Sequence, residues 1–228
     1  MIRRKPVRGV IFDMDGLLLD TEPFYTRASQ VIADRYGKIF DWSVKSRMIG
    51  KRAAESARVF VEGLGLPMTP EEYLVERQSI LDELFPLAEP MPGAVRLTEH
   101  LHRSAIPLAV ATSSDRPHFH LKTSRHQAWF RIFDCMVIGD DPAVRRGKPA
   151  PDVFLVAAER LGVEPEDCLV FEDSPVGIEA AVAAGMASIA VPDPNLQPGM
   201  LDGADQVLAS LEEFDPAPWG LPPYQPAR

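Results

Sequence analysis

Asp13 and Asp15 are the first residues of the sequence whose types and spacing could do chemistry. They directly follow an apolar run in the stretch VIFDMDGLLLD, and Gly16 comes next. A carboxylate can act as a nucleophile, as a general acid and base, or as a metal ligand. Aspartate also forms turns and caps helices, so the pair predicts a reaction site only if other reactive groups lie beside it.

Later apolar runs are also followed by polar side chains of complementary types. They supply hydroxyl groups at Thr112, Ser113 and Ser114, an ammonium group at Lys148, and carboxylates at Glu172 and Asp173. Each group has a local alternative: the hydroxyls could form a turn, the lysine could be an exposed charge, and the second acid pair could cap the following helix. Ligands of open parallel sheets bind beyond the carboxyl ends of the strands, so the combination favours a single site.

Four carboxylates at one edge of a sheet would repel one another unless a cation joined them. Mg²⁺ prefers hard oxygen ligands and commonly links protein carboxylates to a phosphate group. The sequence therefore predicts a Mg²⁺ site at this edge. Any phosphorylated small substrate would have to be captured by this metal ion and a local basic cluster.

The elements that must position these residues alternate between strands and helices. Apolar runs of strand length occupy 7–13, 107–113, 135–139, 168–173, 187–191 and 206–210, and helical patterns occupy 93–103, 117–127, 152–161 and 175–184. Most of the runs are continuously apolar, which is typical of strands buried on both faces of a parallel sheet. We expect an α/β fold with a doubly wound, Rossmann-like parallel sheet.

Residues 21–89 interrupt this alternation with helical stretches alone, so we expect an inserted all-helical cap domain within a core domain of residues 1–20 and 90–228. Two crossings near residues 20 and 90 would let such a domain open and close. The proline-rich segment 215–228 predicts an irregular tail that packs Trp219 and Tyr224 on the core or remains loose.

Composition excludes several classes of function. Hydrophobic residues make up 46% of the 228 residues, which is ordinary for a globular protein, and the formal net charge of -9 disfavours a nucleic acid polymer as partner. Because no apolar segment approaches the roughly 18 residues of a membrane span, we expect a cytoplasmic protein without a membrane partner. We also expect a monomer or a weak dimer. Cys135 and Cys168 lack metal-binding spacing and are expected to be reduced thiols in strands.

Four motifs, DMDGLLLD, ATSS, GKPAPDVF and FEDSPVGIEAA, occur in the order found in the haloacid dehalogenase-like hydrolases, and the sequence resembles that family. The resemblance implies a first-type helical cap between the first two motifs and a phosphatase that uses Mg²⁺. It implies that Asp13 is the nucleophile that becomes an aspartyl phosphate. It also implies that Asp15 protonates the leaving alcohol and then activates water.

The resemblance also implies roles for the other residues of the four motifs. The Gly16 amide would face the phosphate oxygens, with Ser113 and Ser114 also binding substrate. Thr112 would donate to the phosphoryl group, and Lys148 would neutralise its charge. Mg²⁺ would be held by Asp13, Asp173 and the backbone carbonyl of Asp15, with Glu172 binding directly or through water.

The identity of the substrate is less constrained than the reaction. Within that family, the sequence closely resembles the pseudouridine-5′-phosphatase group, through stretches such as DWSVKSRMIGK, GDDPAVRRGKPAPDVFL and GLPPY. This resemblance makes pseudouridine 5′-phosphate the predicted substrate. Sugar phosphates and glycerol phosphate are alternatives. A β-phosphoglucomutase-like mutase is an alternative function, although Tyr25 and Ala53 fall at the positions of that enzyme's histidine and arginine. A shift of one residue would place Arg52 at the arginine position. A protein that binds a phosphosugar without turnover is a third possible function, besides the phosphatase and the mutase.

Basic side chains outside the four motifs could contact a nucleotide-like substrate. Lys51 is the preferred contact, because it follows Met48-Ile49-Gly50 in the predicted cap. The remaining candidates are expected to be mostly solvated charges. They are Arg52, Lys122, Arg125, His126, Arg145 and Arg146.

Overall fold

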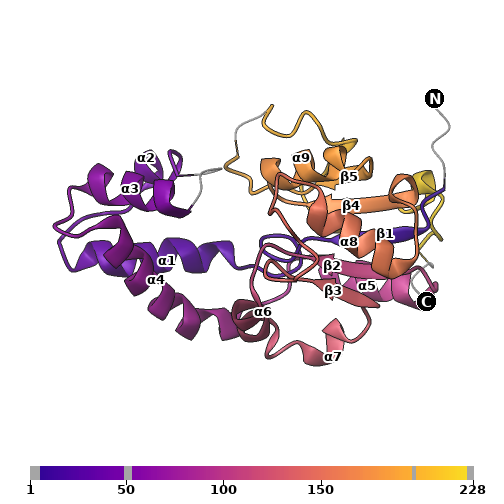
Figure 1. Cartoon of the computed structure of the whole chain (residues 1–228), viewed down its shortest axis with the longest axis horizontal. Helices are drawn as coiled ribbons and strands as arrows, with labels where there is room; N and C mark the ends of the chain where they lie inside the picture. Colours follow the sequence, from indigo (N-terminus) through magenta and orange to yellow (C-terminus); the bar gives the residue numbers. More distant parts are fainter. Residues whose placement is uncertain (1–5, 49–52, 197–198, 225–228) are drawn as a thin grey trace. The chain divides into compact units, whose positions relative to one another are not determined.

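The computed structural model describes residues 6–48, 53–196 and 199–224 (Figure 1). Contacts divide the chain into two compact units, with boundaries after Asp20 and before Glu89. Thr21–Ala88 form one unit, and the residues before and after them form the other. The unit formed by the residues on both sides of Thr21–Ala88 contains the sheet.

The sheet has six parallel strands in the order β3-β2-β1-β4-β5-β6. Their bounds are β1 Gly9–Phe12, β2 Leu108–Ala111, β3 Cys135–Val137, β4 Cys168–Glu172, β5 Ala187–Ala190 and β6 Gln206–Val207. Each strand lies inside an apolar run that predicted one. This order is the doubly wound order, so the predicted fold class is confirmed.

The two central strands are buried along their whole length. All four residues of β1 and all five of β4 are buried, because helices cover both faces of a parallel sheet. The chain runs from β1 outward to β2 and β3, and then returns to β4 on the other side of β1. The strand order therefore reverses between β1 and β4, which is where open α/β sheets bind ligands.

Helices α8 and α9 cover one face of the sheet and share a core with it, formed by residues such as Ile11, Val170 and Phe154. The helices of this unit are α5 Ala94–Arg103, α6 Arg116–Thr123, α7 Gln127–Phe130, α8 Asp152–Leu161 and α9 Pro175–Ala183. The helix expected at 117–127 ends earlier, at Thr123, and a second, short helix begins at Gln127. The hydroxyl of Ser124 donates to the carbonyl of Leu121 at 2.7 Å, and this local bond competes with continuation of α6.

The opposite face carries an aromatic core. Phe12 and Phe171 stack with ring centroids 5.0 Å apart, and Phe214 meets Phe171 edge-on at 4.9 Å. Successive residues of a strand point to opposite faces, which is why Ile11 faces α8 and Phe12 faces this core. Phe214 brings the segment that precedes the tail onto the sheet.

Residues Thr21–Ala88 fold into helices around their own core. The helices are α1 Glu22–Asp34, α2 Trp42–Lys45, α3 Ala53–Leu64 and α4 Pro70–Leu84, followed by the short turn Phe85–Leu87. Phe60 stacks on Tyr73 with centroids 4.2 Å apart, and Thr69 and Glu72 form a capping box at the start of α4. The described residues of this unit, 21–48 and 53–88, contain no β-strand.

The proline-rich tail is packed on the α/β unit as far as residue 224. Trp219 is buried, and its carbonyl accepts from the amide of Val7 at 3.0 Å. Arg96 of α5 lies over the ring of Tyr224, 4.1 Å from its centroid. Of the two open alternatives for this segment, packing on the core describes the residues up to 224.

The two cysteines lie in strands as free thiols, Cys135 in β3 and Cys168 in β4. Burial raises the pKa of Cys135 to about 11 and that of Cys168 to about 12. Both groups therefore stay protonated and pack as small apolar side chains. Across the described ranges, the helices are all too short or too polar to cross a bilayer.

We expect Phe171→Ala to destabilise the protein by about 3–5 kcal/mol, because it removes a fully buried ring and leaves a cavity between Phe12 and Phe214. The free energy of unfolding in urea measures this change. Leu155→Ala is the matched control, because Leu155 is 38% exposed on α8 and its truncation should cost far less. Equal losses in the two variants would contradict this account of the core.

Candidate active site

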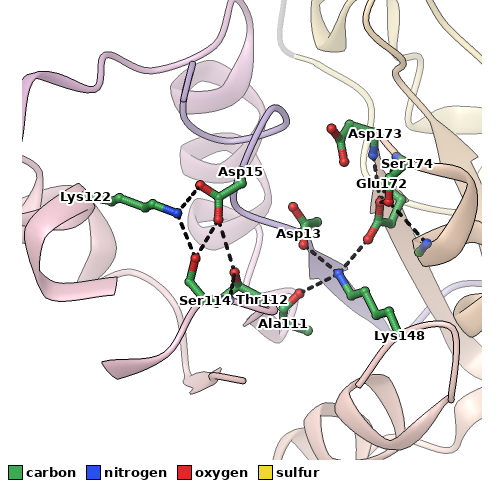
Figure 2. A network of polar contacts seen from close by, with 11 residues as sticks. Asp13, Asp15, Ala111, Thr112, Ser114, Lys122, Lys148, Glu172, Asp173 and Ser174 are labelled. Carbon is green, nitrogen blue, oxygen red and sulfur yellow. Dashed lines mark hydrogen bonds and ion pairs between the residues drawn. The ribbon is translucent and has the colours of Figure 1, made fainter. Parts of the chain in front are cut away.

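One buried lysine joins two acids at the carboxyl ends of β1 and β4. Lys148 Nζ donates to Asp13 Oδ1 and to Glu172 Oε1, each at 2.6 Å, and to the carbonyl of Ala111 at 3.2 Å. Figure 2 shows the ammonium group between the two carboxylates. The side chain of Lys148 is 5% exposed, so these acceptors replace water around its charge. The cluster lies where the strand order reverses.

Burial is the largest single influence on the pKa values of both Asp13 and Lys148. It raises the pKa of Asp13 to about 7; Lys148 opposes that shift, whereas Glu172 and Asp15 add to it. Burial also acts to lower the pKa of Lys148, but its ion pairs with Asp13 and Glu172 outweigh burial and raise it. Lys148 is therefore a permanent cation. The raised pKa of Asp13 indicates that one ammonium group does not fully offset the burial of Asp13 together with its neighbouring carboxylates.

Glu172 accepts hydrogen bonds at both of its carboxylate oxygens. Its Oε2 accepts from the amides of Asp173 and Ser174 and from the Ser174 hydroxyl, each at 2.9 Å, while Oε1 accepts from Lys148. Glu172 is fully buried, and a Cβ at Gly177 would overlap its carboxylate. The first turn of α9 thus leaves room for this carboxylate, and Glu172 holds both Lys148 and the loop after β4 in place.

The acids of this edge form a donor set that fits a divalent cation. Asp13, Glu172 and Asp173 each offer an oxygen, and these oxygens lie within 4.8 Å of one another. Oxygen-only donors in a charged cluster suit a hard cation such as Mg²⁺, which keeps several sites for water and phosphate. Oε2 of Glu172 already has three donors, so Asp13 and Asp173 are the better placed ligands.

Asp15 belongs to a second polar network, formed with residues of the loop after β2 and of α6. Lys122 Nζ lies 2.7 Å from Asp15 Oδ1 and donates to Ser114 Oγ at 2.8 Å. Ser114 Oγ in turn donates to Asp15 Oδ2 at 2.8 Å. Thr112 Oγ1 is 3.5 Å from the same oxygen and accepts from the Ser114 amide at 3.0 Å. Figure 2 shows Asp13 and Asp15 directed toward different lysines.

Lys122 is the residue of this site that the sequence analysis missed. A solvated charge or a substrate contact was expected, whereas its side chain is 1% exposed and paired with Asp15. A signal was available in the sequence, because Phe119, Lys122 and Thr123 have the i, i+3, i+4 spacing of the buried face of α6. A lysine on an apolar face is seldom buried without an acidic partner, so its position indicated an ion pair.

Gly16 is required by space as well as by backbone conformation. Its φ is +74°, and a Cβ at this position would lie 2.5 Å from Asp173 Oδ2. The predicted sharp turn is therefore present. The expectation for its amide is not met, because that amide donates to the carbonyl of Leu19 at 2.9 Å. The bond closes the turn after β1 and directs the amide into it rather than toward an anion.

The remaining predicted residues lie apart from the two networks or cannot be located. Ser113 is exposed after β2. Lys51 and Arg52 fall outside the described residues. Arg125 pairs with Glu89 and Arg146 pairs with Asp152, and these arginine side chains are 56% and 72% exposed. They fit the expectation of solvated charges.

Comparison with known proteins shows the family to which this chain belongs. The family model of the haloacid dehalogenase-like (HAD) hydrolases matches residues 7–185. The (DL)-glycerol-3-phosphatase 2 of Arabidopsis thaliana is 51% identical over 97% of this chain and 95% of its own length. A protein of Drosophila melanogaster called "Probable pseudouridine-5'-phosphatase" is 47% identical over 96% of each chain.

A solved structure has the same fold. It is a HAD family hydrolase from Deinococcus radiodurans with bound phosphate and sodium, and it matches 96% of this chain and 99% of its own with a TM-score of 0.81 and 26% identity. The likeness to named phosphatases extends over nearly the whole sequence. The chain therefore belongs to the haloacid dehalogenase-like hydrolases, as a phosphatase of small phosphate esters.

Proposed function

We propose that this protein is a Mg²⁺-dependent phosphatase in which Asp13 takes the phosphoryl group from a small monoester. The observation that carries the proposal is the position of Asp13: it is buried, it is paired with Lys148 at 2.6 Å, and it shares an acidic cluster with Asp173. A carboxylate is a weak nucleophile and depends on positioning and charge neutralisation, which this arrangement supplies.

The reaction has two steps that use the two acids differently. An oxygen of Asp13 forms a bond to phosphorus while the ester oxygen leaves, and Asp15 gives that oxygen a proton. Asp15 then removes a proton from water as the water oxygen attacks phosphorus, and the bond to Asp13 breaks. Inorganic phosphate is released, and both side chains return to their starting states. The separate partners of Asp13 and Asp15 support this division of roles.

Lys148 and Thr112 stabilise the transferring group. Lys148 stays cationic beside Asp13, so it offsets charge on the nucleophile and on the phosphoryl oxygens. The hydrogen bond from the hydroxyl of Thr112 to Asp15 is long, at 3.5 Å, and therefore weak. The hydroxyl proton can turn toward a phosphoryl oxygen instead. Glu172 acts through Lys148 and through the loop that carries Asp173.

Asp13 and Asp173 would hold the metal ion, with Glu172 in the same cluster. The backbone carbonyl of Asp15 is the further ligand that the family resemblance implies. When bound, Mg²⁺ supplies charge neutralisation and orientation for the phosphoryl group. Gly16 helps to make this site possible, because any side chain there would press on Asp173.

Glycerol 3-phosphate and pseudouridine 5′-phosphate are the two substrates that the comparisons favour. The predicted substrate was pseudouridine 5′-phosphate, and a relative called by that activity is 47% identical. A relative called a glycerol-3-phosphatase is 51% identical over a similar length, so we rank glycerol 3-phosphate first. Both esters leave an alkyl alcohol, and the polar networks at the sheet edge suit either one.

Replacing Asp13 by asparagine should reduce phosphate release by ~10⁴-fold or more, because an amide cannot form the acyl phosphate. Mass spectrometry after rapid acid quenching should detect one phosphoryl group on the peptide that contains Asp13 in the unmodified protein. Asp202→Asn is the matched control, since Asp202 is an exposed aspartate. Full activity in Asp13→Asn would refute the proposed nucleophile.

Adding Mg²⁺ to metal-free protein should raise its melting temperature, and chelation should stop phosphate release. At a concentration of 100 times the Kd, the stabilisation is about 2.7 kcal/mol. Asp173→Asn should remove most of this shift because it withdraws a ligand, whereas Asp202→Asn should keep it. A shift of the same size in Asp173→Asn would rule out the proposed ligand set.

A panel of phosphate esters should give the highest kcat/KM with glycerol 3-phosphate, followed by pseudouridine 5′-phosphate. The panel needs sugar phosphates as well, and release of inorganic phosphate is the measurement. Two results would count against hydrolysis as the function. One is interconversion of glucose 1-phosphate and glucose 6-phosphate that is faster than phosphate release, and the other is binding without turnover.

A further inference from the structure

We propose that Lys122 is a positioning residue for Asp15, which fixes the orientation of the carboxylate that transfers the proton. This inference rests on the acid and base role proposed for Asp15. It adds a residue outside the four motifs to the machinery of the site. The observation behind it is a closed cycle of contacts among Lys122, Ser114 and Asp15.

The cycle occupies both oxygens of Asp15. Lys122 Nζ is 2.7 Å from Oδ1, and Ser114 Oγ donates to Oδ2 at 2.8 Å. The third side of the cycle is the bond from Lys122 Nζ to Ser114 Oγ at 2.8 Å. A carboxylate held at both oxygens cannot rotate about its terminal torsion without breaking one of these contacts. The contacts with Lys122 and Ser114 therefore fix the orientation of the carboxylate plane.

Burial makes the contact of Lys122 with Asp15 strong. The Lys122 side chain is 1% exposed, so its ammonium group has given up nearly all contact with water. A buried charge requires an opposite charge and hydrogen-bond acceptors, which Asp15 and Ser114 supply. Asp15 is partly exposed at 22% and so remains open to a substrate. The lysine is the anchored partner, and the aspartate is the partner that reacts.

The backbone that carries Lys122 is well fixed. Asp115 caps α6 by accepting from the amide of His118 at 3.0 Å. Phe119, one turn before Lys122, is buried and packs edge-on against Phe130 with centroids 5.9 Å apart. The hydroxyl of Thr123 donates to the carbonyl of Phe119 at 2.7 Å. The position of the ammonium group is thus set by a capped and packed helix, which suits a positioning role.

The orientation of Asp15 matters most in the step that protonates the leaving group. An ammonium group only donates, so Oδ1 beside Lys122 must stay an acceptor. The transferable proton therefore belongs on Oδ2, which also accepts from the hydroxyl of Ser114. An alkyl alcohol needs that proton as its bond to phosphorus breaks. A nitrophenolate leaves as a stable anion and does not. Loss of the positioning residue should therefore affect alkyl esters far more than nitrophenyl esters.

The experiment compares kcat/KM for two substrates on the same preparation of full-length protein with Mg²⁺. The substrates are p-nitrophenyl phosphate and whichever of glycerol 3-phosphate and pseudouridine 5′-phosphate is hydrolysed faster. The variants are Lys122→Met, Asp15→Asn and the double variant. Lys38→Met is the matched control, because Lys38 is exposed. The ratio of the two kcat/KM values does not depend on the folded fraction.

We expect Asp15→Asn to lower the kcat/KM of the alkyl ester by about 10²–10⁴-fold relative to the nitrophenyl ester. Lys122→Met should lower it in the same direction by about 10- to 100-fold, because a misplaced catalytic group can cost that much. The double variant should be no worse than Asp15→Asn alone, since the lysine acts only through that aspartate. Lys38→Met should leave the ratio unchanged.

Equal losses on both substrates in Lys122→Met, or losses that multiply in the double variant, would overturn the inference and leave the function of Asp15 intact. An unchanged ratio in Asp15→Asn would instead overturn the proposed role of Asp15 itself. If Lys122→Met does not fold, Ser114→Ala carries the test. It removes only the hydroxyl that donates to Oδ2 and should change the ratio in the same direction, whereas an unchanged ratio would overturn the inference.

Discussion

The contact of Lys148 with Asp13 and Glu172 is the interaction on which the rest of the site depends. Without that ammonium group, the ends of β1 and β4 would bring carboxylates together in a buried place with nothing to offset their charge. The adjacent β1 and β4, on either side of the point where the strand order reverses, make this concentration of acids unavoidable. The same excess of negative charge is what makes the edge suitable for a divalent cation and, with it, a phosphate ester.

The two aspartates of the first motif form ion pairs with different lysines. Asp13 faces Lys148 on the side of β4, and Asp15 faces Lys122 on the side of β2. Neighbouring acids that had the same surroundings would have similar chemistry, whereas these two are held by different partners and can serve different steps. The division depends on packing, because each ammonium group is buried and its position follows from the element that carries it.

Glycine is as necessary to this arrangement as the charged residues. A side chain at Gly177 would overlap Glu172, and one at Gly16 would press on Asp173. Gly16 allows the loops after β1 and β4 to approach closely, and Gly177 leaves room for Glu172 beside the first turn of α9. Phe12 and Phe171, which are paired across β1 and β4, stack their rings just before these loops.

The sequence by itself determined the fold class and most of the reactive groups, because a parallel sheet places the ends of its strands at one edge and apolar runs mark those strands. The strand pattern thereby predicted that Asp13, Lys148, Glu172 and Asp173 lie at the same edge of the sheet. Only the tertiary structure decided that Lys122 is buried against Asp15, and that the Gly16 amide closes its own turn. The physical reason is range: strand patterns follow from neighbouring residues, whereas the partner of a charge or an amide is fixed by segments that meet only after folding.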